Sequence, residues 1–157
     1  MWWRLTRPEF MKQKGEGNRK AMKRIVDSGE VPGILAFVDG KAVGWCSVAP
    51  RKSFPTLEHS RILKPVDDEP VWSIVCFFIA KPFRHKGMST KLLKAAIEHA
   101  TKQGAEIVEG YPVESDKAQP DAFVYTGLSS AFRKAGFKEA ARRSKTRPIM
   151  RYVLEGN

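Results

Sequence analysis

Apolar and polar positions fall into blocks along this chain, and the blocks after residue 30 predict strands. Two apolar runs, Gly33 to Val38 and Lys41 to Val48, flank the dipeptide Asp39-Gly40. That dipeptide is typical of a tight hairpin, because both turn positions favour positive φ. A third run, Val71 to Ala80, is apolar on both faces, as buried strands are. The pattern therefore predicts a hairpin followed by a buried strand.

An amphipathic helix is predicted directly after the buried strand, from Gly87 to Gln103. Its apolar stripe carries Met88, Leu92 and Ala96, whereas lysines occupy the opposite side. The next apolar run, Glu106 to Val113, lies after this crossover helix. We therefore expect it to pair in parallel with the earlier strand.

Both ends of the chain predict further elements. Pro8 is suited to open a first helix, and Asn18 is a suitable N-cap for a second helix that ends at Gly29. In the rest of the chain, an irregular stretch is predicted over Ala49 to Pro70 and a polar loop over Glu114 to Thr126. A short helix is predicted over Gly127 to Ala135, and a final hairpin is formed by Phe137 to Arg142 with Pro148 to Leu154.

Composition limits the class of protein. The length of 157 residues suits one domain with a full core, over residues 1–157. With 42% apolar residues the chain is too apolar for disorder, and no apolar run approaches the ~20 residues that span a bilayer. Two cysteines and three scattered histidines are too few for a disulfide framework or a metal site. We therefore expect a cytoplasmic protein with reduced thiols, no metal and no membrane contact.

The formal net charge of +11 favours an anionic partner. Nucleic acid is one such partner, but the sequence has no zinc-finger spacing and no RNP-type aromatic motif, which disfavours it. A better-defined candidate is the turn Arg84 to Ser89, RHKGMS, between the buried strand and the helix. The first N–H groups of a helix have no partner inside it, and Gly87 permits a close approach. This turn is therefore predicted to bind phosphate.

With this turn at its centre, the order of elements resembles the GNAT N-acetyltransferase superfamily. The signature of that family, Arg/Gln-x-x-Gly-x-Gly/Ala, is matched by Arg84 to Ser89, with Ser89 in place of the last Gly or Ala. A second landmark, a short helix ending in Gly-Phe, is matched by AFRKAGF at Ala131 to Phe137. The resemblance implies an α/β (α+β mixed sheet) fold of the acyl-CoA N-acyltransferase type, with helices on both faces of a twisted sheet of about six strands.

One element of the family has no clear counterpart. Its members begin with a strand that pairs with the hairpin, but MWWRLTRPEF does not have a strand pattern. Either Trp2 to Leu5 form a short version of that strand, or the chain starts late relative to its relatives.

The resemblance implies acetyl-CoA as co-substrate. Its pyrophosphate would lie on the N–H groups from His85 to Thr90, and its pantetheine arm would lie beside Phe77 to Ile79, where a strand N–H near Phe78 or Ile79 would stabilise the oxyanion. The cofactor-binding residues are thus expected to be Phe77, Phe78, Ile79, Arg84, His85, Lys86, Gly87, Met88, Ser89, Thr90 and Phe132.

The acid and base of the family are both missing from their usual positions. Ser73 and Val75 stand where a carboxylate or His often removes the amine proton, and Phe132 stands where a Tyr often protonates the leaving sulfur. The remaining candidates for catalysis are Glu109, Tyr111 and Tyr125, together with the acidic residues of the irregular stretch before the buried strand. Removal of the proton through ordered water is another route.

The function implied is transfer of an acetyl group from acetyl-CoA to the amine of a small molecule or peptide by direct attack. Two alternatives stay open. One is an acyl-CoA-binding module of the same fold without catalysis, and the other is a basic nucleic-acid or ribosome-associated protein. The identity of the acceptor and the presence of a homodimer also stay open.

Overall fold

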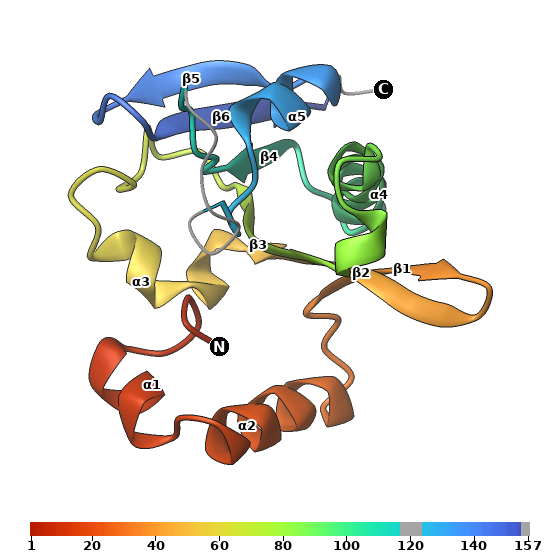
Figure 1. Ribbon diagram of the computed structural model, residues 1–157. Coiled ribbons are helices and arrows are strands. Elements are labelled where there is room, and N and C mark those ends of the chain that lie inside the picture. Colours follow the sequence, from red (N-terminus) through yellow and green to blue (C-terminus); the bar gives the residue numbers. More distant parts are fainter. Residues whose placement is uncertain (117–123, 155–157) are drawn as a thin grey trace.

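A mixed six-stranded sheet with the strand order β1-β2-β3-β4-β6-β5 forms the centre of the computed structural model, which describes residues 1–116 and 124–154 (Figure 1). All neighbouring strands are antiparallel except β3 and β4, which are parallel. The strands are β1 Gly33–Val38, β2 Lys41–Pro50, β3 Trp72–Ile79, β4 Ile107–Gly110, β5 Lys138–Arg142 and β6 Pro148–Val153.

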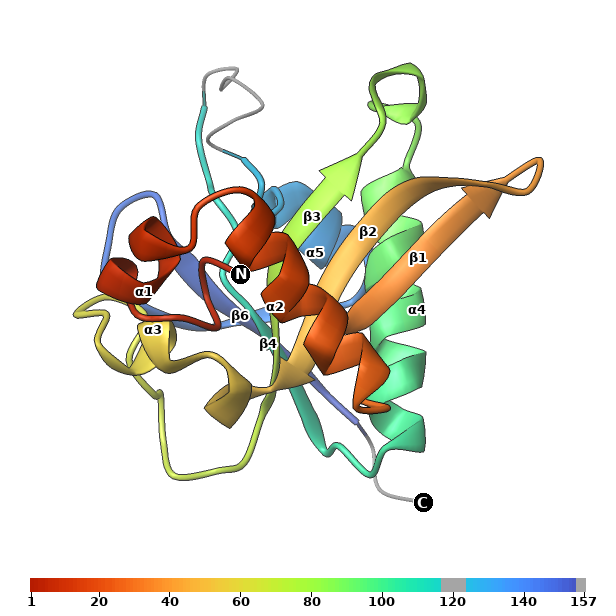
Figure 2. The same ribbon diagram turned by 90° about the horizontal axis from the view of Figure 1, so that it is seen from below.

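Helices cover both faces of this sheet. The α-helices are α1 Arg7–Lys12, α2 Glu16–Asp27, α3 Pro55–Glu58, α4 Met88–Lys102 and α5 Ser129–Lys134, and 3-10 turns span Arg51–Ser53 and Lys81–Phe83. In Figure 2, α2 crosses in front of the sheet, whereas α4 lies behind β1 and β2. No helix among the described residues is long and apolar enough to cross a membrane.

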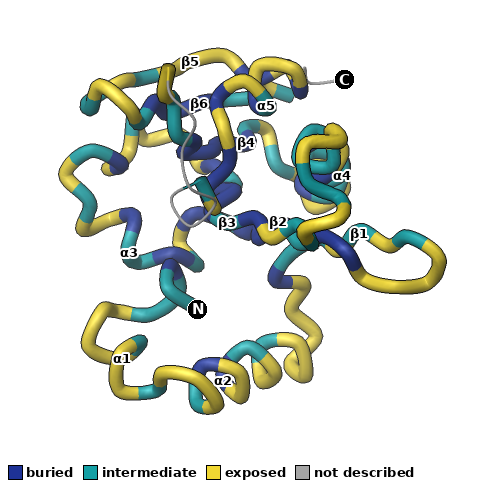
Figure 3. The backbone as a smooth tube through the Cα atoms, viewed as in Figure 1, coloured by how far each residue is buried: buried dark blue, intermediate teal, exposed yellow. Residues whose placement is uncertain are grey.

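The two faces bury separate apolar clusters. Under α4 and α5, Leu92, Leu93 and Phe132 pack against the sheet. On the opposite face, Trp3 and Leu57 pack with others around β3 and the end of β4. Burial is concentrated in the strands and in the inward side of α4, while the outer surfaces of α1 and α2 are exposed (Figure 3). The sheet is therefore a partition between two cores.

A bulge in β3 separates this strand from β4. Ser47 of β2 faces Cys76, but the next residue, Val48, faces Ile74, so that Val75 has no partner in β2. The parallel pairing with β4 is limited to Trp72 to Ile74. Since a bulge bends its strand and increases its twist, the C-terminal half of β3 is left without a strand on that side.

The main elements predicted from the pattern are confirmed. Asp39 and Gly40 both have positive φ, as the predicted turn between β1 and β2 requires. The parallel pairing of β3 with β4 across α4 and the final β5–β6 hairpin are also found. Of the predicted loop 114–126, residues 117–123 lie outside the described part of the chain.

The N-terminal region differs from the prediction. Asn18 does not cap α2, because the helix begins two residues earlier with Gly15 at the N-cap, at φ 78°. Instead Asn18 is buried and donates from Nδ2 to the Phe10 carbonyl at 3.1 Å, which ties α2 to α1. Trp2 to Leu5 form a turn rather than a strand, so that β1 is the edge of the sheet among the described residues.

Candidate functional site

A cavity of about 570 Å³ lies where the end of β3 meets the start of α4. Its first wall contains most of the residues predicted to bind a cofactor, namely Phe77, Phe78, Ile79, Arg84, His85, Gly87, Met88, Ser89 and Thr90. Its second wall, from α5 and the segment before it, is made by Val124, Tyr125, Gly127, Leu128, Ser130, Ala131 and Lys134. The structure thus brings these distant segments together around one space.

The backbone of β3 presents hydrogen-bonding groups on the side away from β2. Ala80 N–H donates to the Val43 carbonyl at 2.8 Å, so by alternation the N–H of Phe78 also points toward β2. Phe77 and Ile79 therefore point to the other side. There Phe77 N–H donates to the Tyr125 carbonyl at 2.6 Å, and the Ile79 carbonyl accepts from Arg84 Nε at 2.8 Å. Of the two residues suggested for the oxyanion, Ile79 has the suitable orientation and Phe78 does not.

The turn before α4 concentrates N–H groups at the other end of the cavity. His85 and Gly87 have positive φ, at 57° and 76°, and Gly87 is the N-cap of the 15-residue helix. The first turn of α4 contains no acidic residue, and its N–H groups have no carbonyl partner within the helix. A Cβ on Gly87 would meet nothing within 4 Å, so the turn is open to a ligand. These features suit a pyrophosphate, which is the group that acetyl-CoA would place there.

Two residues predicted to bind the cofactor lie away from the cavity lining. Lys86 is exposed. Phe132 is 0% exposed, and its ring packs edge-on against Phe77 and Phe137. It also lies so close to Gly110 that a Cβ there would come within 2.1 Å of Cε1. Phe132 therefore supports the second wall from inside the core.

Tyr125 lies on the cavity wall, and its ring also lies near that of Trp3. It lines the cavity with 37% of its surface exposed, and its ring centroid is 6.5 Å from that of Trp3 on the opposite face of the sheet. Burial raises the pKa of the Tyr125 phenol above its usual value. The hydroxyl is therefore protonated at neutral pH and can act as a proton donor.

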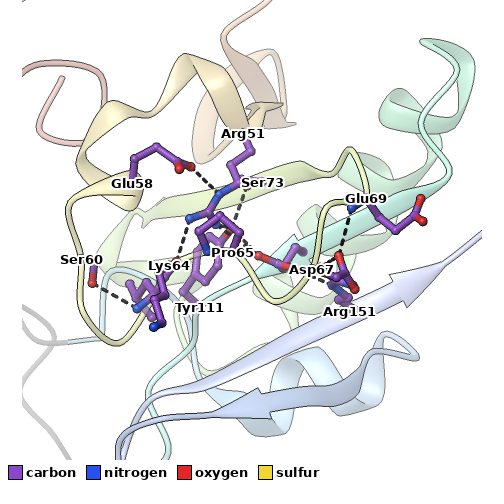
Figure 4. Close-up of polar contacts among 12 residues, drawn as sticks. Arg51, Glu58, Ser60, Lys64, Pro65, Asp67, Glu69, Ser73, Tyr111 and Arg151 are labelled. Carbon is purple, nitrogen blue, oxygen red and sulfur yellow. Dashed lines mark hydrogen bonds and ion pairs between the residues drawn. The ribbon is translucent and has the colours of Figure 1, made fainter.

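Glu109 and Tyr111 lie outside this cavity and are buried. Figure 4 shows Tyr111 next to Arg51 and Ser73. The Tyr111 hydroxyl donates to Glu109 Oε1 at 2.8 Å, and Arg51 Nη1 donates to the same hydroxyl at 2.8 Å. Arg151 Nε donates to Glu109 Oε2 at 2.6 Å, and Ser73 lies 2.8 Å from the Tyr111 hydroxyl. Burial and the charge of Glu109 raise the pKa of Tyr111. These hydrogen bonds join β3, β4 and β6 to the segment after β2.

The residues of the second wall were mostly missed by the sequence interpretation. Only Tyr125 had been singled out, as a candidate for catalysis. The signal that was available is the short helix ending in Gly136-Phe137, since that landmark lies next to the wall that α5 provides. Among the described residues, no group of three or more His, Cys, Asp or Glu side chains could hold a metal ion.

Comparison with known proteins identifies the family. The family model described as "Acetyltransferase (GNAT) family" matches residues 1–122. No curated protein matches the sequence significantly. Solved structures share its fold at low sequence identity, and three of them illustrate the range.

The ribosomal-protein-alanine N-acetyltransferase of Brucella melitensis is 18% identical with a TM-score of 0.56, over 88% of this chain and 78% of that one. YncA of Salmonella typhimurium, solved with its cofactor acetyl-CoA, is 16% identical with a TM-score of 0.58, over 89% of this chain and 74% of its own. PaiA N-acetyltransferase of Thermoplasma acidophilum, in complex with coenzyme A, is 14% identical with a TM-score of 0.56, over 94% and 77%. Because the family model covers well over half of its residues, the chain belongs to the GNAT family of acetyltransferases.

Proposed function

We propose that this protein transfers an acetyl group from acetyl-CoA to a primary amine by direct attack of the amine on the thioester. The observation that carries the proposal is the single cavity that joins the N–H-rich turn at His85 and Gly87 to the open edge of β3. One end of this cavity suits a pyrophosphate, and at the other end the N–H of Ile79 can donate to an extended pantetheine arm.

In this proposal the residues of the first wall hold the co-substrate. The N–H groups from His85 to Thr90 bind the pyrophosphate, and Arg84 supports the turn through its bond to the Ile79 carbonyl. The N–H of Ile79 is the donor for the thioester or its oxyanion, because the N–H of Phe77 is already bonded to Tyr125.

Tyr125 is the residue proposed to handle a proton. As the amine nitrogen bonds to the carbonyl carbon, the carbon–sulfur bond breaks, and the Tyr125 hydroxyl protonates the leaving sulfur. Its raised pKa suits an acid rather than a base. The amine proton leaves through water, since Ser73 is bonded to Tyr111 and Val75 is an apolar residue in the core. Positioning by the cavity supplies much of the remaining rate enhancement.

The test uses two glycines with matched conformations at the ends of α4. Gly87 and Gly104 have φ of 76° and 82°, and a Cβ at either would meet nothing within 4 Å. Gly87→Glu and Gly104→Glu therefore impose the same backbone strain, but only the first places a carboxylate at the proposed pyrophosphate site. Acetyl-CoA at 100 times its Kd should stabilise the wild type and Gly104→Glu by about 2.7 kcal/mol in thermal unfolding. Equal stabilisation of Gly87→Glu would refute the proposed site.

A second candidate function is supported by the missing acid and base. Because Ser73 and Phe132 both occupy structural positions, an acyl-CoA-binding protein without catalysis fits the same cavity. Release of free CoA in a panel of amines separates the two functions. Stabilisation by acetyl-CoA with no CoA release from any amine would favour the binding protein.

A further inference from the structure

A row of three apolar side chains crosses the sheet beside the cavity. Leu35 pairs with Trp45, and Trp45 pairs with Phe78, so that one residue from each of β1, β2 and β3 stands side by side on one face. Gly44, the residue before Trp45, faces α4, because a Cβ there would lie 3.3 Å from Leu92 Cδ1. Since successive residues of a strand alternate between the faces, the apolar row of Leu35, Trp45 and Phe78 lies on the face away from α4.

Much of this apolar row is open to water. Phe78 is 58% exposed and Leu35 is 52% exposed, while Trp45 between them is half-buried. The Trp45 ring lies against β1, because a Cβ on Gly33 would come within 2.6 Å of its Cη2. In Figure 2 the hairpin end of β1 and β2 and the C-terminal end of β3 lie beyond the part of the sheet that α2 crosses. The row therefore forms an accessible apolar strip that spans two inter-strand spacings, about 10 Å.

Phe78 connects the apolar row to the cavity. Phe77 packs against Phe132 on the α5 side, whereas Phe78, the next residue of β3, points to the opposite face, and both line the cavity. The cavity therefore extends around the free edge of β3 from one face of the sheet to the other. The N–H of Ile79, the proposed donor to the thioester, lies on this edge. A co-substrate held on the α4 side leaves the side of Phe78 for the amine.

We propose that the acyl acceptor carries an apolar alkyl or aryl group beside its amine, and that this group lies along the apolar row. The inference rests on the proposed acetyltransferase function and names its substrate class. With the nitrogen at the thioester, next to Phe78, the rest of the acceptor extends over Trp45 toward Leu35. An apolar group there removes the exposed parts of the row from water, with a gain that grows with each methylene. A polar group would lose hydration against side chains that offer no acceptor or charge in return.

The experiment follows CoA release with ethylamine, butylamine and hexylamine, which differ in chain length but hardly in basicity. In wild type, kcat/KM should rise about 3- to 4-fold for each added methylene, as expected for burial of one CH₂ group. Leu35→Thr changes the far end of the row, so it should reduce the gain from butylamine to hexylamine more than the gain from ethylamine to butylamine. Phe78→Thr changes the end next to the thioester and should reduce both gains.

The ratio between amines is the readout, because a variant that impairs folding or acetyl-CoA binding lowers all three rates together. Val153→Thr is the matched control and should keep the wild-type ratios, since Val153 is an exposed apolar residue on β6 outside the cavity lining. Calorimetry of the same amines with the CoA-loaded protein distinguishes the two proposals. Binding that strengthens with chain length but gives no turnover would refute only the acetyltransferase.

Other results would overturn the apolar acceptor itself. Turnover that does not depend on chain length would do so, and so would equal binding, or no binding, of the three amines. Light scattering tests a different occupant of the row. If Leu35→Thr converts a dimer into a monomer and leaves the amine ratios unchanged, the row is a contact between two copies of the chain and not an acceptor site.

Discussion

At the scale of single residues, Tyr125 lines the cavity, whereas Phe132, which stands at the family position of the acid, is buried in the core. Tyr125→Phe should lower kcat by about 10²-fold or more while leaving the Kd for acetyl-CoA unchanged, because the ring and the backbone bond to Phe77 are retained. With a pKa above its ordinary value, Tyr125 stays protonated as the pH rises through neutrality. The part of kcat that depends on proton donation by Tyr125 is therefore lost only at alkaline pH, where the phenol deprotonates.

Tyr152→Phe is the control, since Tyr152 packs on Phe137 away from the cavity. Steady-state rates and calorimetry measure the two quantities. An unchanged kcat in Tyr125→Phe would remove this tyrosine from the proton transfer.

Tyr111 illustrates the opposite case, a titratable residue whose bonds are all structural. Tyr111→Phe should reduce the free energy of unfolding by about 1–3 kcal/mol, because Arg51, Ser73 and Glu109 all lose a partner in a buried site. We expect kcat to stay unchanged. Urea unfolding and CoA release give both numbers for one sample. A large fall in kcat with full stability would instead place Tyr111 in the reaction.

At the scale of elements, α5 is held against β4 by the edge of the Phe132 ring. A Cβ at Gly110 would come within 2.1 Å of Phe132 Cε1, so Gly110→Ala forces the ring and α5 outward. We expect a loss of about 1–3 kcal/mol in the free energy of unfolding from this overpacking, together with weaker acetyl-CoA binding, because α5 forms one cavity wall.

Replacing the Phe132 ring by a smaller side chain provides the control. The double variant Gly110→Ala with Phe132→Leu should recover part of the stability lost by Gly110→Ala, because the smaller side chain leaves room for the added methyl group. Chemical denaturation of the four proteins in this cycle measures the coupling. Strictly additive effects would mean that the two residues do not press on each other.

The same scale shows which features a sequence can predict. The segment 71–104 was predictable because its signals are local: an apolar run, a positive-φ glycine and a 3.6-residue stripe all agree. The start of α2 was not, because Asn18 has its partner on α1 and only the fold brings them together. The bulge at Val75 could not be predicted, because β3 is apolar on both faces and has no alternation of apolar and polar residues that a bulge would interrupt. The roles of Glu109 and Tyr111 depend on the face of the sheet to which their side chains point. The sequence pattern of a short strand does not determine that face.

At the scale of the whole molecule, several carboxylates pair with arginines of the same chain and the surplus charge is positive. Glu114 pairs with Arg133 and Arg142, and Asp67 pairs with Arg151, so these carboxylates are neutralised by the fold. The net charge of +11 then acts on ligands from outside. The phosphates of acetyl-CoA are the groups that would respond to it.

Salt separates this long-range attraction from the contacts within the cavity. Raising the ionic strength from 0.01 M to 0.15 M shortens the Debye length from about 30 Å to about 8 Å, so the Kd for acetyl-CoA should rise several-fold. S-acetylpantetheine carries the same thioester and no phosphate, and its Kd should stay constant over the same range. Calorimetric titrations of both ligands measure the difference. Equal salt dependence would mean that the turn at Gly87 does not bind the phosphates, whereas a slope confined to acetyl-CoA supports the division of the cavity into a phosphate end and an acyl end.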